Sequence, residues 1–281
     1  MSFGLLDTPF ILSLAFYPRT ASITDGDRVG APHIHSGTIP VWNSPPEGDT
    51  PPDEVIGYRL YCATPTSPLI VYFHGNAEIA PDYDDIAQFY NQRVGVSLMV
   101  VDYRGFGWST GSPSFSALID DTEYVLKALP TIRTQYGIVP ESPLYLMGRS
   151  MGSAPAIHIA FSHPDQVKGL IIESGFADLF SVLVRMGFPS EALGRMIDPL
   201  GNERKMETIH LPLLIIHGED DNLIPFKHAQ RLYDASPSTR KRLLRIVHAG
   251  HNDLMMQGLW DYFGAIADFV KPHEEKEESA T

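Results

Sequence analysis

The feature that most restricts the fold of this chain is a regular alternation of short apolar runs with longer amphipathic segments from residue 69 onward. Runs that are apolar at successive positions are typical of parallel strands buried on both faces. The runs occupy residues 69–73, 98–102, 144–147, 170–173, 213–217 and 243–247. The segments 79–90, 115–136, 151–163 and 259–270 carry apolar residues at helical spacing. The alternation therefore predicts an α/β fold, with a mostly parallel central sheet and helices on both faces.

Two more strand-like segments precede this region, at residues 34–42 and 55–62. The stretch between them, NSPPEGDTPPD, is polar and rich in turn-forming residues, so we expect it to connect two antiparallel strands. The length of 281 residues fits one domain. Around its core we expect an N-terminal extension over about residues 1–30, a short cap over about 175–210 and an acidic, mobile tail at 273–281.

Charge and cysteine content limit the partners and the compartment. The formal net charge is −13, so phosphates would be repelled and we expect no nucleic-acid partner. Cys62 is the only cysteine, which excludes an internal disulfide and suits a reducing compartment, and we expect a cytoplasmic protein. The apolar run at residues 9–17 is shorter than the about 20 residues of a membrane-spanning helix. It either packs on the body as a short helix or forms a peripheral membrane or lid element.

A serine flanked by glycines directly follows one of the apolar runs. Residues 144–147 lead into Gly148, Arg149, Ser150, Met151 and Gly152, and a helical segment follows. A hydroxyl mounted on a sharp strand-to-helix turn needs small residues two positions before and two after it, because larger side chains would clash as the chain reverses. This G-x-S-x-G pattern, in its strand–turn–helix context, predicts that Ser150 is a nucleophile.

A serine hydroxyl is a weak nucleophile and needs a base, which in turn needs an acid to orient it. For a serine on such a turn, the expected chain order is serine, acid and histidine, each just after a strand. Three acids, Glu219, Asp220 and Asp221, follow the run at 213–217, so the residues alone leave Asp221 and Asp220 as candidates. His251 follows a glycine after the last run, and we predict it as the base in preference to His248.

Attack on a carbonyl develops negative charge on its oxygen, which two fixed N–H donors would stabilise. The backbone N–H of Met151 stands at the start of a helix and is one predicted donor. The loop after residues 69–73 contains Gly75, which permits a tight backbone turn. We therefore predict the backbone N–H of Asn76 as the second donor of this oxyanion hole.

Five motifs together resemble those of the α/β-hydrolase superfamily: residues 72–76 (YFHGN), 102–107 (DYRGFG), 148–152 (GRSMG), 217–221 (HGEDD) and 250–253 (GHND). More narrowly, the chain is similar to the α/β-hydrolase-domain proteins that include protein depalmitoylases and lysophospholipid or monoacylglycerol hydrolases. The resemblance extends over about residues 69–270. It implies Asp221 as the acid, because the family acid stands four residues after the histidine at 217, and His251 as the base. It also implies that residues 102–107 form a structural turn.

The chain departs from these relatives at its N-terminus. The depalmitoylases carry a cysteine-rich, lipid-modified N-terminus that this sequence lacks, so we do not expect membrane delivery by that route. The short cap contains an apolar set of side chains that either pack in a core or form a lid over a pocket: Phe176, Leu179, Phe180, Val182, Leu183, Met186 and Phe188. If they form a lid, an acyl chain or another apolar group is the natural guest of the pocket. Its pocket candidates are Phe176, Phe180, Leu183 and Met186.

These residues predict a serine hydrolase that cleaves a carboxylic ester or thioester of an apolar acyl substrate, a small or lipid-like molecule, through an acyl-enzyme. Acyl transfer or peptide cleavage by the same three residues is an alternative, as is a catalytically silent hydrolase fold that binds a partner. No phosphate-binding loop or dinucleotide motif occurs in the sequence, so we expect no cofactor. His33 and His35 lack a third ligand nearby, so we expect no metal.

Overall fold

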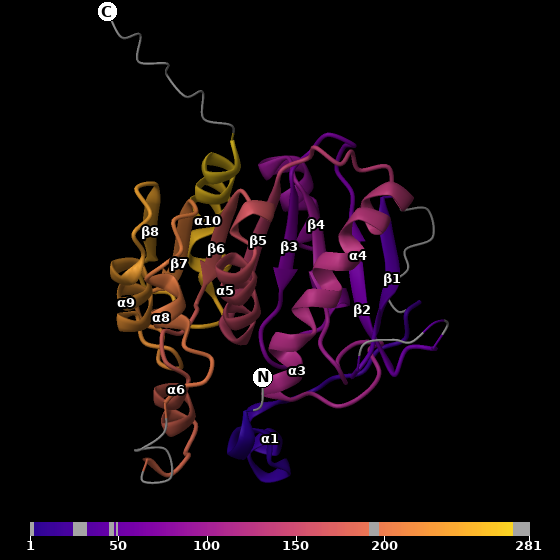
Figure 1. The fold of residues 1–281 in the computed structure, drawn as a ribbon. Helices are drawn as coiled ribbons and strands as arrows, with labels where there is room; N and C mark the ends of the chain where they lie inside the picture. Colours follow the sequence, from indigo (N-terminus) through magenta and orange to yellow (C-terminus); the bar gives the residue numbers. More distant parts are fainter. Residues whose placement is uncertain (1–2, 25–32, 45–47, 49, 191–196, 272–281) are drawn as a thin grey trace, which may run out of the picture.

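The computed structural model describes residues 3–24, 33–44, 48, 50–190 and 197–271. Within these ranges the chain forms an eight-stranded sheet in the order β1-β2-β4-β3-β5-β6-β7-β8 (Figure 1). β2 pairs antiparallel with β1 and β4, and all other neighbours pair parallel. The strands are β1 Ile34–Val41, β2 Glu54–Tyr61, β3 Leu69–Phe73, β4 Ser97–Val101, β5 Leu144–Arg149, β6 Gly169–Glu173, β7 Leu213–Gly218 and β8 Lys241–Ile246. This sheet confirms the predicted mostly parallel α/β fold.

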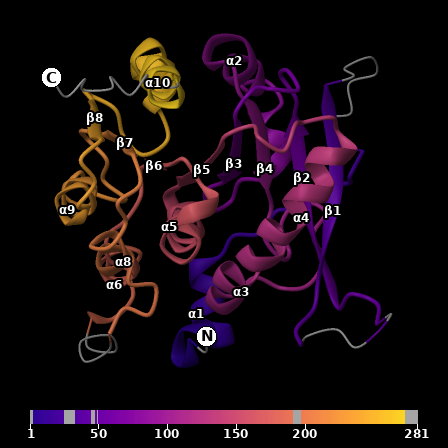
Figure 2. The same ribbon diagram turned by 45° about the horizontal axis from the view of Figure 1, so that its top comes forward.

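Helices cover both faces of the sheet. They are α1 Pro9–Ala15, α2 Ala87–Phe89, α3 Phe115–Asp120, α4 Thr122–Gln135, α5 Ser153–Ser162, α6 Leu179–Arg185, α8 Asn202–Met206, α9 Lys227–Ala235 and α10 Leu254–Val270. Helices α4, α5, α8 and α9 lie on one face, and α2 and α10 lie on the other (Figures 1 and 2). No helix of the described ranges combines the length and the apolar character needed to cross a bilayer.

The strands are apolar at successive positions because both faces of the sheet are covered. Successive side chains of a strand point to opposite sides of the sheet. In β3, Leu69, Val71 and Phe73 belong to the core that includes α4 and α5, whereas Ile70 and Tyr72 belong to the core that includes α10. All five side chains are buried, which explains why this run carries no alternation of polar and apolar residues.

The segment 79–90 is not the continuous helix that its spacing predicted. It forms a 3₁₀ turn at Ala80–Tyr83, the short helix α2, and the start of a π-helical turn at Tyr90–Val94. The backbone of Ala80 is bound by side chains from elsewhere in the fold: its N–H donates to Asp102 Oδ1 at 2.9 Å, and its carbonyl accepts from the Tyr61 hydroxyl at 3.1 Å. These long-range contacts replace helical hydrogen bonds. The spacing of apolar residues within the segment cannot indicate them, because the partners are distant in sequence.

Two other sequence predictions need smaller corrections. The helix predicted over 115–136 divides into α3 and α4 at Asp121, whose carboxylate accepts two hydrogen bonds from Arg104. β8 is not buried on both faces, because it is an edge strand of the sheet, and Arg242 and Arg245 on it are exposed. Charged side chains on an edge strand hinder pairing with a second molecule.

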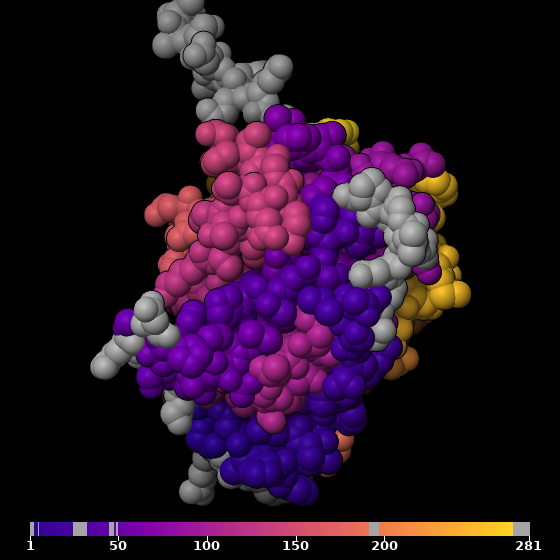
Figure 3. Space-filling model, turned by 90° about the vertical axis from the view of Figure 1, so that its right-hand side faces the viewer, coloured from indigo at the N-terminus to yellow at the C-terminus, as the bar shows by residue number. Residues whose placement is uncertain are grey.

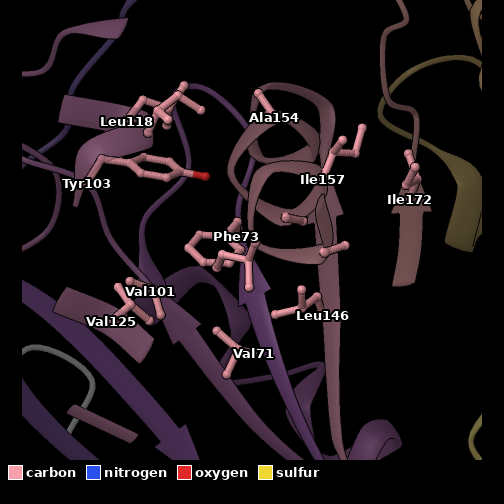
Figure 4. Packing of buried hydrophobic residues seen from close by; sticks show 14 of the residues in the cluster. Val71, Phe73, Val101, Tyr103, Leu118, Val125, Leu146, Ala154, Ile157 and Ile172 are labelled. Carbon is pink, nitrogen blue, oxygen red and sulfur yellow. The ribbon is translucent and has the colours of Figure 1, made fainter. Parts of the chain in front are cut away.

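Helix α5 anchors the turn that carries Ser150. Ala154 and Ile157 of α5 belong to the same buried cluster as Leu146 of β5 and Phe73 of β3 (Figure 4). The strand before Ser150 and the helix after it are therefore both fixed in the core, which leaves the turn between them little freedom.

Helices α1, α3 and α6 gather beyond the carboxyl ends of the parallel strands, at the lower edge of Figure 1. Residues 9–17 include the short helix α1, on which Ile11 and Ala15 are buried, and Asp7 accepts a hydrogen bond from the Phe115 N–H at 2.8 Å. The N-terminal residues form the lower end of the molecule in Figure 3. Residues 191–196 of the expected cap and the acidic tail lie outside the described residues.

We expect the substitution Ile157→Ala to lower the free energy of unfolding by about 2–5 kcal/mol, because it leaves a cavity between α5 and the sheet. Phe161→Ala on the same helix is the control, since Phe161 is 45% exposed, and should change stability by no more than about 0.5 kcal/mol. Urea unfolding measures both values. Equal losses in the two variants would contradict the packing of α5 described above.

Candidate active site

Ser150 occupies the sharp reversal between β5 and α5. Its φ is +52°, in the left-handed region that residues with a side chain rarely adopt. The flanking glycines make this reversal sterically feasible: a Cβ on Gly148 would lie 2.2 Å from the carbonyl oxygen of Gly152, and a Cβ on Gly152 would lie 2.0 Å from that of Phe73. The strand–turn–helix context expected from the sequence is present.

The structure brings Ser150, His251 and Asp221 into one hydrogen-bonded line. His251 Nε2 lies 3.0 Å from Ser150 Oγ, and His251 Nδ1 lies 2.7 Å from Asp221 Oδ2. An ionised carboxylate can only accept, so Nδ1 carries the proton and Nε2 is left to accept the hydrogen bond of the serine hydroxyl. Ser150 lies at the carboxyl end of β5, His251 follows β8 and Asp221 follows β7, so all three lie at the same end of the parallel strands.

Asp221 is buried and densely hydrogen-bonded. Its Oδ1 accepts the backbone N–H groups of Leu223 at 2.9 Å and Ile224 at 2.7 Å, and His217 Nε2 lies 3.3 Å from its Oδ2. Burial alone would raise the pKa of Asp221, but the hydrogen bonds from His217 and His251 outweigh it and hold that pKa well below its ordinary value. The carboxylate is therefore charged beside the imidazole.

The alternative acid and base are not part of this line. The side chains of Asp220 and His248 are 62% and 83% exposed, and His248 Nδ1 lies 4.0 Å from the Asp220 carboxylate. Asp220 and His248 thus face solvent together, away from the buried Asp221.

The two predicted backbone donors, Asn76 and Met151, line the same cavity as Ser150 and His251. In the described ranges neither backbone N–H donates to another protein group, so both remain available to a ligand. The side chain of Asn76 also fixes its loop: Nδ2 donates to the Ala15 carbonyl at 2.8 Å, and Oδ1 accepts the Tyr17 N–H at 2.9 Å. The N-terminal segment is thereby tied to the loop after β3.

An apolar cavity of about 370 Å³ opens beside Ser150. Three of the four predicted pocket residues, Phe176, Leu183 and Met186, line it. Phe180 does not line it; this side chain packs against the main hydrophobic core instead. The helical turn of α6 explains the difference, since residues 179, 182, 183 and 186 share one side of a helix and residue 180 points elsewhere.

Part of the cavity wall was not predicted from the sequence: Leu118 of α3 and Tyr17 near α1 line the cavity. Leu179 and Val182 of α6, which belong to the apolar set of the expected cap, line it as well. For Tyr17 the sequence indicated only that residues 9–17 could form a lid, because its position depends on how the N-terminal segment packs at the carboxyl ends of the strands.

The residues 102–107 form a turn behind the loop after β3. Asp102 is buried and its Oδ1 lies 3.1 Å from His74 Nε2, while the Tyr103 hydroxyl donates to the His74 carbonyl at 2.6 Å. These contacts support the loop that carries Asn76. Among the described residues, no group of three or more His, Cys, Asp or Glu side chains is placed to hold a metal ion.

A comparison with protein-family models matches residues 64–197 and 184–255 to the family described as serine aminopeptidase, S33. Among curated proteins, the chain is 31% identical over 216 residues to the alpha/beta hydrolase domain-containing protein 17C of Xenopus tropicalis, a match that covers 76% of this chain and 64% of that protein. The chain spans less than two thirds of the length of the curated relatives it matches.

Solved structures share the fold at low sequence identity. An esterase of Pyrococcus furiosus superposes with a TM-score of 0.67 at 16% identity, covering 91% of this chain and 96% of the esterase. A monoacylglycerol lipase of Paleococcus ferrophilus gives a TM-score of 0.55 at 19% identity, with 76% and 97% of the two chains covered. At these identities the likeness is one of fold alone.

The lowered pKa of Asp221 gives its ionised form a stabilising role that depends on pH. This contribution is fully present above the ordinary pKa of 3.8 and is lost as the pH falls toward the lower folded-state pKa. We expect the stability difference between wild type and Asp221→Asn to be largest near neutral pH and to shrink below about pH 4. Urea unfolding at several pH values measures it.

Asp220→Asn is the matched control and should follow the wild type at every pH, because Asp220 is largely exposed. A stability difference for Asp221→Asn that stays constant from pH 3 to pH 7 would contradict the assignment of Asp221 as the buried, hydrogen-bonded acid.

Proposed function

The chain belongs to the serine aminopeptidase S33 family of α/β-hydrolases, and we propose that it is a serine hydrolase that cleaves carboxylic ester or thioester bonds of an apolar acyl substrate. The observation that carries this proposal is the hydrogen-bonded line from Ser150 through His251 to Asp221 beside an apolar cavity.

In the proposed reaction, His251 Nε2 takes the proton of the Ser150 hydroxyl as Oγ attacks the carbonyl carbon of the substrate. Asp221 accepts the Nδ1–H and stabilises the imidazolium that forms. The imidazolium then gives its proton to the leaving alcohol or thiol, and an acyl-enzyme remains on Ser150. His251 next deprotonates a water molecule, which attacks the acyl carbon; as the bond to Ser150 Oγ breaks, the imidazolium returns the proton to Oγ and the carboxylic acid leaves.

The backbone N–H groups of Asn76 and Met151 would donate to the oxygen that becomes negative in each tetrahedral intermediate. Both residues line the cavity, and neither N–H donates to another protein group within the described residues, so both are free to donate to this oxygen. Removing one donor of this kind typically costs about 2.7–4 kcal/mol of transition-state stabilisation.

The cavity favours an acyl group over the amino terminus of a peptide. An aminopeptidase must bind an ammonium group, and a charge taken out of water needs an opposite charge or several hydrogen-bond acceptors. In the described part of the chain, no Asp or Glu side chain lines this cavity, whereas Leu, Val, Ile, Met and Phe side chains form most of its wall. We therefore favour ester or thioester cleavage over peptide cleavage.

Hydrolysis of p-nitrophenyl esters of increasing acyl length, with a matched thioester, tests the proposal. We expect the wild type to turn over these substrates and Ser150→Ala to lose at least about 10⁴-fold in kcat, since the nucleophile is gone. The acyl length with the highest kcat/KM reports the depth of the cavity.

A fluorophosphonate probe is the companion measurement, because it labels an activated serine whatever the natural acyl group. It should label the wild type and not Ser150→Ala. If no ester is hydrolysed and no label appears on Ser150, the hydrolase proposal fails and a binding role of the fold replaces it.

We also propose that the cavity entrance contacts a lipid surface. Tyr17, Met186 and Leu223 line the cavity and are exposed, and Phe10 and Leu14 are exposed on α1, the helix that precedes Tyr17. We call these five residues the apolar rim. The Phe10 and Phe188 rings, 6.4 Å apart, connect α1 to the segment that follows α6. With a net charge of −13, the chain would favour neutral over anionic lipid.

We expect the double variant Phe10→Ser/Leu14→Ser to lower binding to phosphatidylcholine vesicles at least about tenfold, because each buried side chain of this kind contributes about 1.5–3 kcal/mol. Vesicle flotation measures the bound fraction. Phe161→Ser is the control, since Phe161 is an exposed aromatic on α5 outside the rim. An unchanged bound fraction for the double variant, or an equal loss for the control, would rule out the rim as the contact.

A further inference from the structure

Arg149 lies at the end of β5, next to Ser150, and its guanidinium donates hydrogen bonds to groups on three different segments of the chain. The side chain is largely buried, with 9% of the residue exposed. Nη1 donates to Glu78 Oε1 at 2.5 Å, Nε donates to Glu173 Oε1 at 3.2 Å, and Nη2 donates to Asn252 Oδ1 at 2.8 Å and to the His251 carbonyl at 3.1 Å. The first and last of these contacts reach the two loops that carry Asn76 and His251.

Glu78 connects the guanidinium of Arg149 to the backbone of the loop after β3. Its second oxygen, Oε2, accepts the backbone N–H of Gly75 at 2.7 Å and the hydroxyl of Tyr83 at 2.8 Å. The guanidinium also lies directly against this loop, since a Cβ added to Gly75 would meet Arg149 Nη1 at 2.5 Å. Gly75 therefore provides the space that the arginine occupies, one residue before the proposed oxyanion donor Asn76.

Glu173 fixes the other side of the guanidinium to the sheet. This carboxylate is buried at the end of β6, and its Oε2 accepts hydroxyl hydrogen bonds from Tyr262 at 2.7 Å and Tyr72 at 3.1 Å. Burial alone would lower the pKa of Arg149, but Glu78 and Glu173 raise it above its ordinary value. Arg149 is thus a permanently charged group held between two carboxylates.

We propose that Arg149 is a positioning residue that locks the loop of Asn76 and the loop of His251 to the strand that carries Ser150. This inference rests on the proposed function, because the geometry it preserves is that of the nucleophile, the base and the oxyanion donor. Arginine suits the task because its planar guanidinium holds five N–H donors in a fixed fork, whereas the ammonium of lysine is a single point charge.

The first test is the steady-state kinetics of Arg149→Met and Arg149→Lys on a short p-nitrophenyl ester. A misplacement of about 1 Å at a reacting group costs about 100-fold in rate, so we expect kcat of Arg149→Met to fall about 100-fold while KM changes by less than about threefold. Lysine restores the charge but cannot reach both loops at once, so kcat of Arg149→Lys should stay at least about tenfold below wild type.

Each loop contact can also be broken separately, with Glu78→Gln for the loop of Asn76 and Asn252→Ala for the loop of His251. Each variant should lower kcat, and each effect should largely disappear when Arg149→Met is already present, because residues in one network are not additive. If Arg149→Met does not fold, the kcat values of Glu78→Gln and Asn252→Ala test the positioning role of Arg149. Unchanged kcat in both would overturn the proposal.

Arg104→Met is the matched control, because it removes a partly buried arginine that binds the carboxylate of Asp121 with two hydrogen bonds away from the cavity. Its kcat should match the wild type. Equal losses in Arg104→Met and Arg149→Met would mean a general effect on stability and would overturn the positioning role, as would full rescue of kcat by Arg149→Lys.

Amide hydrogen exchange tests the same inference without any substrate. Arg149→Met should accelerate exchange in peptides covering residues 74–79 and 247–253, Glu78→Gln only in the first and Asn252→Ala only in the second. If the wild type hydrolyses no ester, the proposed function fails, but this measurement still decides the role of Arg149. Unchanged exchange in both segments of Arg149→Met would refute it.

Discussion

The reversal of the chain at Ser150 is the constraint on which the site depends. A non-glycine residue at φ +52° costs about 1–3 kcal/mol and persists only where its surroundings dictate it. Here β5 before it and α5 after it are both packed in the core, so the turn cannot relax without moving one of them. The same tight approach sets Gly152 against the Phe73 carbonyl, which also fixes the start of the loop that carries Asn76.

Buried charged groups link the loops that surround this turn. Asp221 connects the loop after β7 to that after β8, because it binds its own backbone neighbours and His251 at once. Arg149 connects the loop after β8 to that after β3 through Glu78 and Asn252. Breaking either link would leave a charge buried without its partner, and such a charge is costly. These groups therefore hold the loops in fixed positions, as backbone hydrogen bonds hold the strands.

The strands, the Ser150 turn and the order of the three site residues could be predicted from the sequence because each leaves a local signature. Burial on both faces makes a strand apolar at every position, as in Leu69–Phe73, and the tight turn requires glycine at 148 and 152. The irregular segment 79–90 was missed because Asp102 and Tyr61, distant in sequence, bind the backbone of Ala80. β8 was read as buried because its place at the sheet edge depends on the strand order.

The sequence by itself determined the fold class, the Ser150 turn and the candidates Ser150 and His251 for nucleophile and base, because those features depend on residues close together in the chain and on a fixed chain order. The residues alone left Asp220 and Asp221 open as the acid, and the family resemblance favoured Asp221. Only the tertiary structure decided which side chains form the cavity and which group joins its loops. Arg149 carries no local signal of its contacts, and the sequence left the place of Tyr17 and Phe180 open. Whether such a side chain faces the cavity, the core or a neighbouring loop depends on how segments distant in sequence pack against it.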